Sequence, residues 1–267
     1  MSGDLLQAVV AAARRSADER ERAVPRATLE REARDREAGG ERFRASLTRP
    51  GVRIIAECKR RSPSKGVLRA AYDPVAVAHG YESAGAAAIS VLTEPTFFDG
   101  SLEHLRQVRA AVTTPLLRKD FVITDYQVVE AAAHGADAVL LIVAALDASA
   151  LQRLLELATS LGLATLVEVH DAVELDLALA AGARIVGVNS RNLRTLAVNQ
   201  ATLDELGPRI PGGLVAVAES GLRTPDDLRR LAAARYDAFL IGERFMTTPD
   251  PGAALGALIE ATAKEPA

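Results

Sequence analysis

A carboxylate and an ammonium stand two residues apart at the end of a short apolar run that begins at Ile54. Side chains alternate between the two faces of a strand, so Glu57 and Lys59 should project to the same side. Ionisable groups at the exit of a buried strand are costly unless they are paired or used. A turn rich in Ser, Pro and Gly follows at 62–66. The segment therefore predicts a buried strand that ends in a functional site.

Similar residues follow other apolar runs in the chain. The predicted strands cover 52–58, 86–92, 115–119, 137–143, 163–169, 184–189, 214–219 and 237–242. Ionisable or amide side chains mark six of these eight ends: Glu57, Lys59, Glu94, Lys119, Asp120, Glu168, His170, Asn189, Arg191 and Glu219. Scattered surface charge would not follow this register, so we predict that these ends surround one active site.

The runs alternate with helical segments, of which 148–161 and a helix that begins near Thr224 are the clearest. Several runs are continuously apolar, as is typical of parallel strands covered on both faces. Eight such units and a last helix near 250–263 predict an α/β fold, a (β/α)8 TIM barrel with its active site at the carboxyl ends of the strands. A doubly wound open sheet is the alternative, although no G-x-G-x-x-G follows the first strand.

The first 48 residues differ from the rest, because Arg and Glu alternate there with few apolar residues. We predict that 1–48 form an N-terminal helical extension packed on the barrel, and that 49–267 form the barrel, in one structural domain overall. Two interpretations of the extension stay open: a solvated helical arm or a cap over the active site.

Composition excludes several classes of protein. A net charge of −3 over 267 residues argues against a nucleic-acid binder, and no run of about 20 apolar residues predicts a membrane span. Cys58 is the single cysteine, so no intrachain disulfide can form. The N-terminus lacks a signal-peptide pattern, which predicts a cytoplasmic protein. The histidines at 79, 104 and 134 lack nearby Cys or carboxylate partners, so no metal site is expected.

Two glycine-containing loops near the end of the chain could bind phosphate. Ser220-Gly221 follows the seventh predicted strand, and Gly242-Glu243 follows the eighth. Barrels often hold phosphate between these two loops with backbone N–H groups. The alternative is that both are ordinary turn glycines.

Seven segments in order carry a wider resemblance: IIAECKRRSPSKG at 54–66, VLTEPTFFDGS at 91–101, LLRKDF at 116–121, LVEVHD at 166–171, GVNSRNLRTL at 187–196, VAESG at 217–221 and LIGERFM at 240–246. Together they resemble the indole-3-glycerol phosphate synthases, a family of barrel enzymes in tryptophan biosynthesis. The resemblance covers all eight predicted strands. The loop after Gly242 is its least family-like stretch.

The resemblance implies a carboxy-lyase that acts on 1-(2-carboxyphenylamino)-1-deoxyribulose 5-phosphate by ring closure, decarboxylation and dehydration. It implies that Lys119 is the general acid and that Glu168 acts in the dehydration. Lys59 contacts the substrate carboxylate and supplies a later proton in this hypothesis, with the order of the two lysines left open. Glu57, on the same strand face as Lys59, holds the lysines charged and in place.

Further positions follow from the same resemblance. Asn189 and Arg191 would hold the anthranilate end of the substrate, and Arg suits this because it can bind a carboxylate in bidentate fashion. The other expected contacts are Ser62 as a polar group, Phe98 as an aromatic wall, Glu219 as an orienting group, and Ser220, Gly221, Gly242 and Glu243 around the phosphate. No cofactor or metal is implied. The expected partners are the small sugar phosphate and, beyond it, other tryptophan-pathway enzymes.

Two other functions stay open at this point. A sibling sugar-phosphate isomerase would share the barrel and the phosphate loops but would need a Cys or Asp base. Cys58 is predicted to point away from the barrel interior, so it could not serve as that base, which disfavours the isomerase hypothesis. A non-enzymatic paralogue would have lost Lys119 or Glu168, yet both are present. His170 is interpreted as a structural residue at a helix start.

Overall fold

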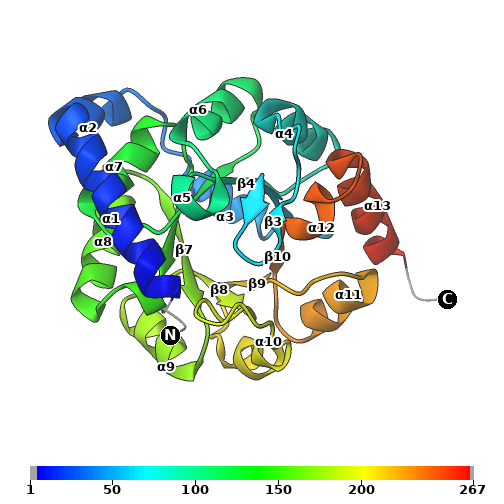
Figure 1. The fold of residues 1–267 in the computed structure, drawn as a ribbon. Helices are drawn as coiled ribbons and strands as arrows, with labels where there is room; N and C mark the ends of the chain where they lie inside the picture. The colour runs from blue at the N-terminus through cyan, green and yellow to red at the C-terminus, as the bar shows by residue number, and fades with distance from the viewer. Residues whose placement is uncertain (1–4, 265–267) are drawn as a thin grey trace.

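The computed structural model describes residues 5–264, and within that range eight parallel strands close into a barrel (Figure 1). The strands are β1 (Ile54–Cys58), β4 (Ala88–Leu92), β5 (Leu116–Lys119), β6 (Ala138–Ile142), β7 (Ala164–Val169), β8 (Ile185–Asn189), β9 (Val215–Glu219) and β10 (Ala238–Ile241). Strand β1 completes the ring by pairing with both β10 and β4. The predicted barrel is confirmed and the open sheet is not formed, and every strand lies within its predicted run.

Helices follow the strands on the outside of the barrel (Figure 1). They are α4 (Pro74–Ser83), α6 (Leu102–Ala111), α7 (Asp125–Ala133), α8 (Ala148–Ser160), α9 (Ala172–Ala180), α10 (Ala201–Leu206), α11 (Pro225–Ala233) and α13 (Pro251–Ala263). Shorter elements are the hairpin β2 (Arg61–Ser62) and β3 (Gly66–Val67), helices α5 (Pro95–Phe98) and α12 (Glu243–Met246), and the 3-10 turns η1 (Val143–Ala145) and η2 (Gly207–Arg209). No helix within 5–264 combines the length and apolarity needed to cross a lipid bilayer.

The predicted helix at Thr224 shows how local sequence sets an element boundary. The Thr224 side chain accepts a hydrogen bond from the Asp227 N–H, and the Asp227 carboxylate accepts one from the Thr224 N–H. This reciprocal capping box satisfies two backbone donors that helix geometry leaves free, and Pro225 starts the first turn. The helix therefore begins where the sequence predicts.

Alternation along each strand separates two apolar cores. Outward residues such as Ala56 and Val167 pack with the surrounding helices, whereas inward residues such as Ile55 and Leu166 fill the barrel. Cys58 is fully buried in the outer core, as predicted, and burial raises the pKa of its thiol. The same alternation decides which strand-end residues face the barrel interior.

The N-terminal segment forms three helices, α1 (Leu5–Ala23), α2 (Arg26–Arg34) and α3 (Gly40–Ser46). Helix α1 contacts α5, α7 and η1, so it lies beside the carboxyl ends of the strands (Figure 1). Its residues Leu6 and Val9 are buried in the inner apolar core. A fully solvated arm is therefore not what the structure contains. Helix α2 packs on α7, and α3 contacts β7.

Candidate active site

The carboxyl ends of the strands open into one cavity of about 700 Å³. Every residue predicted for the site lines it: Glu57, Lys59, Ser62, Phe98, Lys119, Glu168, Asn189, Arg191, Glu219, Ser220, Gly221, Gly242 and Glu243. Strand alternation accounts for this gathering, because each functional strand residue stands two positions after an inward-facing neighbour, as Glu168 does after Leu166. The cavity is large enough for a small-molecule substrate.

The central contact joins the last residue of β5 to the penultimate residue of β7. Lys119 Nζ lies 3.2 Å from Glu168 Oε2. Burial alone would lower the pKa of Lys119, but the surrounding carboxylates, Glu168 foremost, outweigh it and hold that pKa above its usual value. The cavity therefore contains an ammonium group that is charged at neutral pH and has a carboxylate beside it.

Glu168 is fully buried and has two further neighbours. Asn189 Nδ2 donates a hydrogen bond to Glu168 Oε1 at 3.1 Å, and His170 Nε2 lies 3.3 Å from the same oxygen. Burial would raise the pKa of Glu168, but Lys119 and then His170 outweigh it and lower that pKa. Glu168 is thus held as a carboxylate at neutral pH.

His170 was interpreted from the sequence as structural, and the structure instead places it directly against Glu168. The usable signal was its spacing of two residues from Glu168, which puts both on the same side of an extended chain. The bend after β7 keeps that relationship, although His170 itself lies outside the strand.

Glu219 at the end of β9 is a second buried carboxyl group in the cavity wall. Its Oε1 is buried and has no hydrogen-bond partner among the residues the structure describes. Burial, followed by repulsion from Glu168, raises the pKa of Glu219 well above its ordinary value. A Cβ at Gly187 would overlap Glu219 Oε1, so a larger residue at this position would displace the Glu219 carboxyl group. Burial and neighbouring charges thus shift the pKa values of these two neighbouring carboxyl groups in opposite directions, that of Glu168 downward and that of Glu219 upward.

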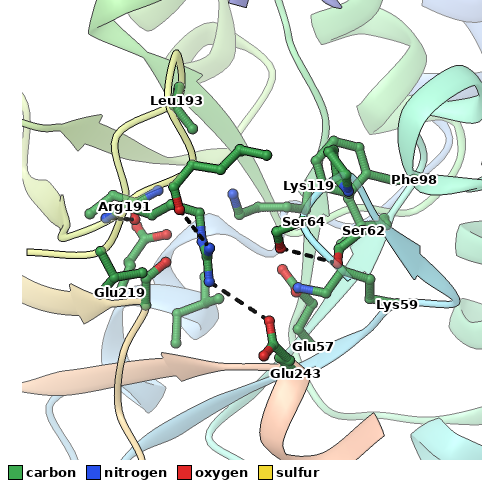
Figure 2. A pocket seen from close by; sticks show the side chains of 18 of the residues that line it. Glu57, Lys59, Ser62, Ser64, Phe98, Lys119, Arg191, Leu193, Glu219 and Glu243 are labelled. Atoms are coloured by element: carbon green, nitrogen blue, oxygen red, sulfur yellow. Dashed lines mark hydrogen bonds and ion pairs between the residues drawn. The ribbon is translucent and has the colours of Figure 1, made fainter. Parts of the chain in front are cut away.

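Glu57 and Lys59 form the pair that their spacing predicts. Lys59 Nζ lies 2.5 Å from Glu57 Oε1, and both side chains are mostly buried (Figure 2). The Glu57 side chain packs directly on Gly242, where an added Cβ would lie 2.5 Å from Glu57 Oε1. Gly242 therefore has a steric reason to be glycine besides any approach of an anion.

The Arg191 side chain forms an ion pair and a hydrogen bond with other residues of the protein. Its Nη2 lies 3.7 Å from Glu243 Oε2, and its Nη1 donates to the Leu196 carbonyl at 3.0 Å (Figure 2). The Asn189 side chain accepts a hydrogen bond from the Arg191 N–H at 3.0 Å. A carboxylate repels phosphate, so the Glu243 side chain suits the arginine, and only its backbone N–H suits a phosphate oxygen.

The loop after β9 begins with two residues of unusual backbone conformation. Ser220 and Gly221 have φ values of 67° and 71°, two consecutive left-handed residues. Ser190 Oγ donates a hydrogen bond to the Ser220 carbonyl at 3.1 Å and steadies the loop. Arg223 and Arg244 also line this part of the cavity and were not predicted from the sequence.

The opposite wall combines a serine-rich turn with apolar side chains. Ser62 is buried, lies 3.4 Å from Ser64 Oγ, and accepts a hydrogen bond from the Lys65 N–H (Figure 2). Phe98 lies in α5, and its ring centroid is 6.3 Å from that of Phe121. Helix α1 adds Leu5, Leu6 and Val9 to this wall, a contribution that sequence reasoning left open.

Within 5–264 no group of three or more His, Cys, Asp or Glu side chains is arranged so that it could hold a metal ion. The cavity thus presents ammonium, guanidinium and carboxyl groups around an apolar wall. Such a set can donate and accept protons and can bind an anionic aromatic compound.

Comparison with known proteins gives a consistent result. A family model described as indole-3-glycerol phosphate synthase matches residues 6–258. An indole-3-glycerol phosphate synthase of Parafrankia sp. (strain EAN1pec) is 59% identical over 78% of this chain and 77% of its own length. One from Mycobacteroides abscessus is 46% identical over 97% of this chain and 95% of its own length. Among solved structures, KGPDC from Streptococcus mutans shares the fold, with a TM-score of 0.61 at 14% identity over 79% of this chain and 97% of that one.

Proposed function

We propose that Lys119 and Glu168 carry the proton transfers in this chain, which belongs to the indole-3-glycerol phosphate synthase family. The chain accordingly catalyses the carboxy-lyase reaction of that family in tryptophan biosynthesis. The observation that supports these residue roles best is the buried contact between the Lys119 ammonium and the Glu168 carboxylate inside the cavity.

The substrate in this proposal is 1-(2-carboxyphenylamino)-1-deoxyribulose 5-phosphate. The ring carbon that carries the carboxylate attacks the ketone carbon, and the Lys119 ammonium protonates the ketone oxygen as negative charge develops there. Loss of CO₂ restores the aromatic ring, and loss of the new hydroxyl group as water completes the indole. The raised pKa of Lys119 supports this role, because the lysine is then protonated when the substrate arrives.

Glu168 and Lys59 act in the dehydration in this proposal. The ionised Glu168 carboxylate stabilises the cationic iminium-like intermediate and accepts a proton as the indole forms. Lys59 binds the substrate carboxylate and can supply the proton that the departing water needs. Glu57 holds Lys59 in place through their 2.5 Å contact.

The two ends of the substrate are held by different groups. Arg191 and Asn189 bind the anthranilate end, which requires Arg191 to exchange its contact with Glu243 for one with the substrate. The aromatic ring lies against Phe98, and Ser62 offers a polar contact beside it. The phosphate lies against the backbone N–H groups of the loops after β9 and β10, which comprise Ser220, Gly221, Gly242 and Glu243. Glu219 orients the polar groups near Glu168.

The proposal extends to organisation and location. Residues 1–48 are an extension of one structural domain with 49–267, which the buried α1 face and the contact of Arg20 with Glu130 support. A cytoplasmic location and contacts with other enzymes of the tryptophan pathway complete the proposal.

Turnover of the sugar phosphate tests the proposal directly. Purified protein and the carboxyphenylamino sugar phosphate should produce indole fluorescence without added metal or cofactor. Folded protein that gives no fluorescence, and no other product by chromatography, would contradict the proposed substrate. A sugar-phosphate isomerase would instead give an isomer of the substrate that retains the carboxylate and lacks the indole emission.

A further inference from the structure

The His170 side chain lies between Glu168, which lines the cavity, and Glu174, which belongs to the outer helix α9. Its Nε2 lies 3.3 Å from Glu168 Oε1, and its Nδ1 lies 2.9 Å from Glu174 Oε2 in α9. The same Glu174 oxygen accepts a hydrogen bond from the His170 N–H at 2.8 Å. Two contacts to one oxygen fix the imidazole ring, so Nε2 can only face Glu168.

The local sequence explains this geometry. Asp171 is the N-cap of α9, and its side chain accepts a hydrogen bond from the Glu174 N–H. Glu174 stands at the third helical position, from which a glutamate side chain reaches back to the chain just before the helix. The start of α9 thereby holds the Glu174 carboxylate against the His170 ring. The ring in turn lies against Glu168 near the end of β7.

The charges around His170 come from two elements. Glu168 on β7 faces one ring nitrogen, and Glu174 on α9 faces the other. Burial alone would lower the pKa of His170, but hydrogen bonds and attraction to these carboxylates raise it to about 10. Lys119 faces the other oxygen of Glu168, so the Glu168 carboxylate lies between two cations.

We propose that His170 is a positioning residue of the reaction, a buried imidazolium that keeps Glu168 ionised and its Oε2 directed at Lys119. A neutral imidazole has one N–H and could satisfy only one of the two carboxylates. The imidazolium can donate from Nδ1 to Glu174 and still present a second N–H, on Nε2, to Glu168 at ion-pair distance, where no hydrogen bond is formed in the described structure. Its charge offsets the buried negative charge when Lys119 gives up its proton during ring closure. This inference rests on the proposed role of Glu168 in catalysis.

Ring-nitrogen NMR tests the charge of His170 without reference to activity. In protein labelled with nitrogen-15 histidine, the signal lost in His170→Gln identifies the residue among the four histidines. We expect both ring nitrogens to carry protons at pH 8, and the midpoint of titration to fall in Glu168→Gln. A neutral ring at pH 7 in the unsubstituted protein would overturn the proposal.

Kinetics then test the positioning role. His170→Gln should lower kcat by about tenfold with little change in KM. In a plot of kcat against pH, the fall in kcat on the acid side should move to higher pH by about one unit. Glu174→Gln should shift this acid-side fall in kcat in the same direction, by a smaller amount. His79→Gln, on an exposed part of α4, is the matched control and should change neither. An unaltered kcat and an unaltered acid-side fall in kcat in folded His170→Gln would overturn the positioning role.

The two hypotheses fail in different ways. If Glu168→Gln retains normal turnover, the proposed catalytic role of Glu168 is wrong, and with it the role of His170. If Glu168→Gln is inactive but His170→Gln behaves as the unsubstituted enzyme, only the inference about His170 is wrong.

Discussion

Arg191 Nη2 lies 3.7 Å from Glu243 Oε2, so the arginine proposed to hold the substrate carboxylate already has a carboxylate of the protein beside it. The pair links the loop after β8 to the start of α12 across the cavity mouth (Figure 2). Binding of substrate must replace this contact with an equivalent one. We therefore expect Glu243 to compete with the substrate for Arg191 and to lower the apparent affinity for substrate.

Removal of the competing charge should strengthen substrate binding. Both partners are partly exposed, so the pair contributes at most about 1 kcal/mol, and Glu243→Gln should lower KM by up to about fivefold with kcat nearly unchanged. Steady-state kinetics by indole fluorescence would measure this. Glu260→Gln, on an exposed position of α13, is the control. A higher KM in Glu243→Gln would show that Glu243 assists binding instead.

Loss of the proposed general acid should affect chemistry more than binding. Lys119→Ala removes the proton donor and should lower kcat by about 10²- to 10⁴-fold. It also leaves the buried Glu168 without its ammonium partner, so the melting temperature should fall as well. Lys264→Ala, at an exposed position, should leave both unchanged. Near-normal turnover in Lys119→Ala would show that another group donates the proton.

A single methyl group at Gly242 should disturb Glu57. The new Cβ in Gly242→Ala would lie 2.8 Å from Glu57 Cβ, so the side chain must move away and its contact with Lys59 must change. Overpacking of this kind costs about 1 to 3 kcal/mol of stability, and kcat/KM should fall. In Gly256→Ala the added Cβ has its nearest contact at 3.8 Å, so this control should be neutral or stabilising. Equal effects of the two substitutions would exclude the steric explanation.

The N-terminal helix should depend on one ion pair for its attachment. Arg20 makes two contacts to Glu130 of α7, at 2.6 and 2.9 Å, and Glu130 is 2% exposed. Glu130 keeps its contact with Arg118 when Arg20 is removed. Arg20→Ala should therefore lower the free energy of unfolding by about 1 to 2 kcal/mol, as measured in urea. Arg106→Ala, at an exposed pair with Glu103 of the same helix α6, should change it by less than half as much.

His170 should make stability depend on pH in a defined window. Its folded-state pKa is raised to about 10, so its stabilising contribution is complete below the ordinary histidine pKa of about 6.5 and is lost as pH rises through 10. The stability gap between the unsubstituted protein and His170→Gln should therefore be widest near pH 6 and should narrow steadily toward pH 10. Urea unfolding at several pH values would measure the gap. A gap that widens with pH would contradict the raised pKa.

The barrel and the gathering of most of the site residues could be predicted from the order of residues along the chain. Continuous apolar runs such as 137–143 mark strands that are covered on both faces, and these strands repeat eight times. The alternation of side chains along a strand then places Glu57, Lys119 and Glu168 inside the barrel, because each strand-end residue follows an inward neighbour. Local periodicity alone is enough for such inferences.

The three-dimensional arrangement of the chain, and not its local pattern, sets which of these groups are partners and in which direction their pKa values shift. The contacts of Arg191 with Glu243, of Lys119 with Glu168 and of Arg20 with Glu130 join residues far apart in sequence, and no periodic signal encodes them. Glu168 and Glu219 have the same side chain at similar strand ends, yet the pKa of Glu168 is lowered and that of Glu219 is raised. Protonation depends on burial and on neighbouring charges in three dimensions, and folding alone brings those neighbours together.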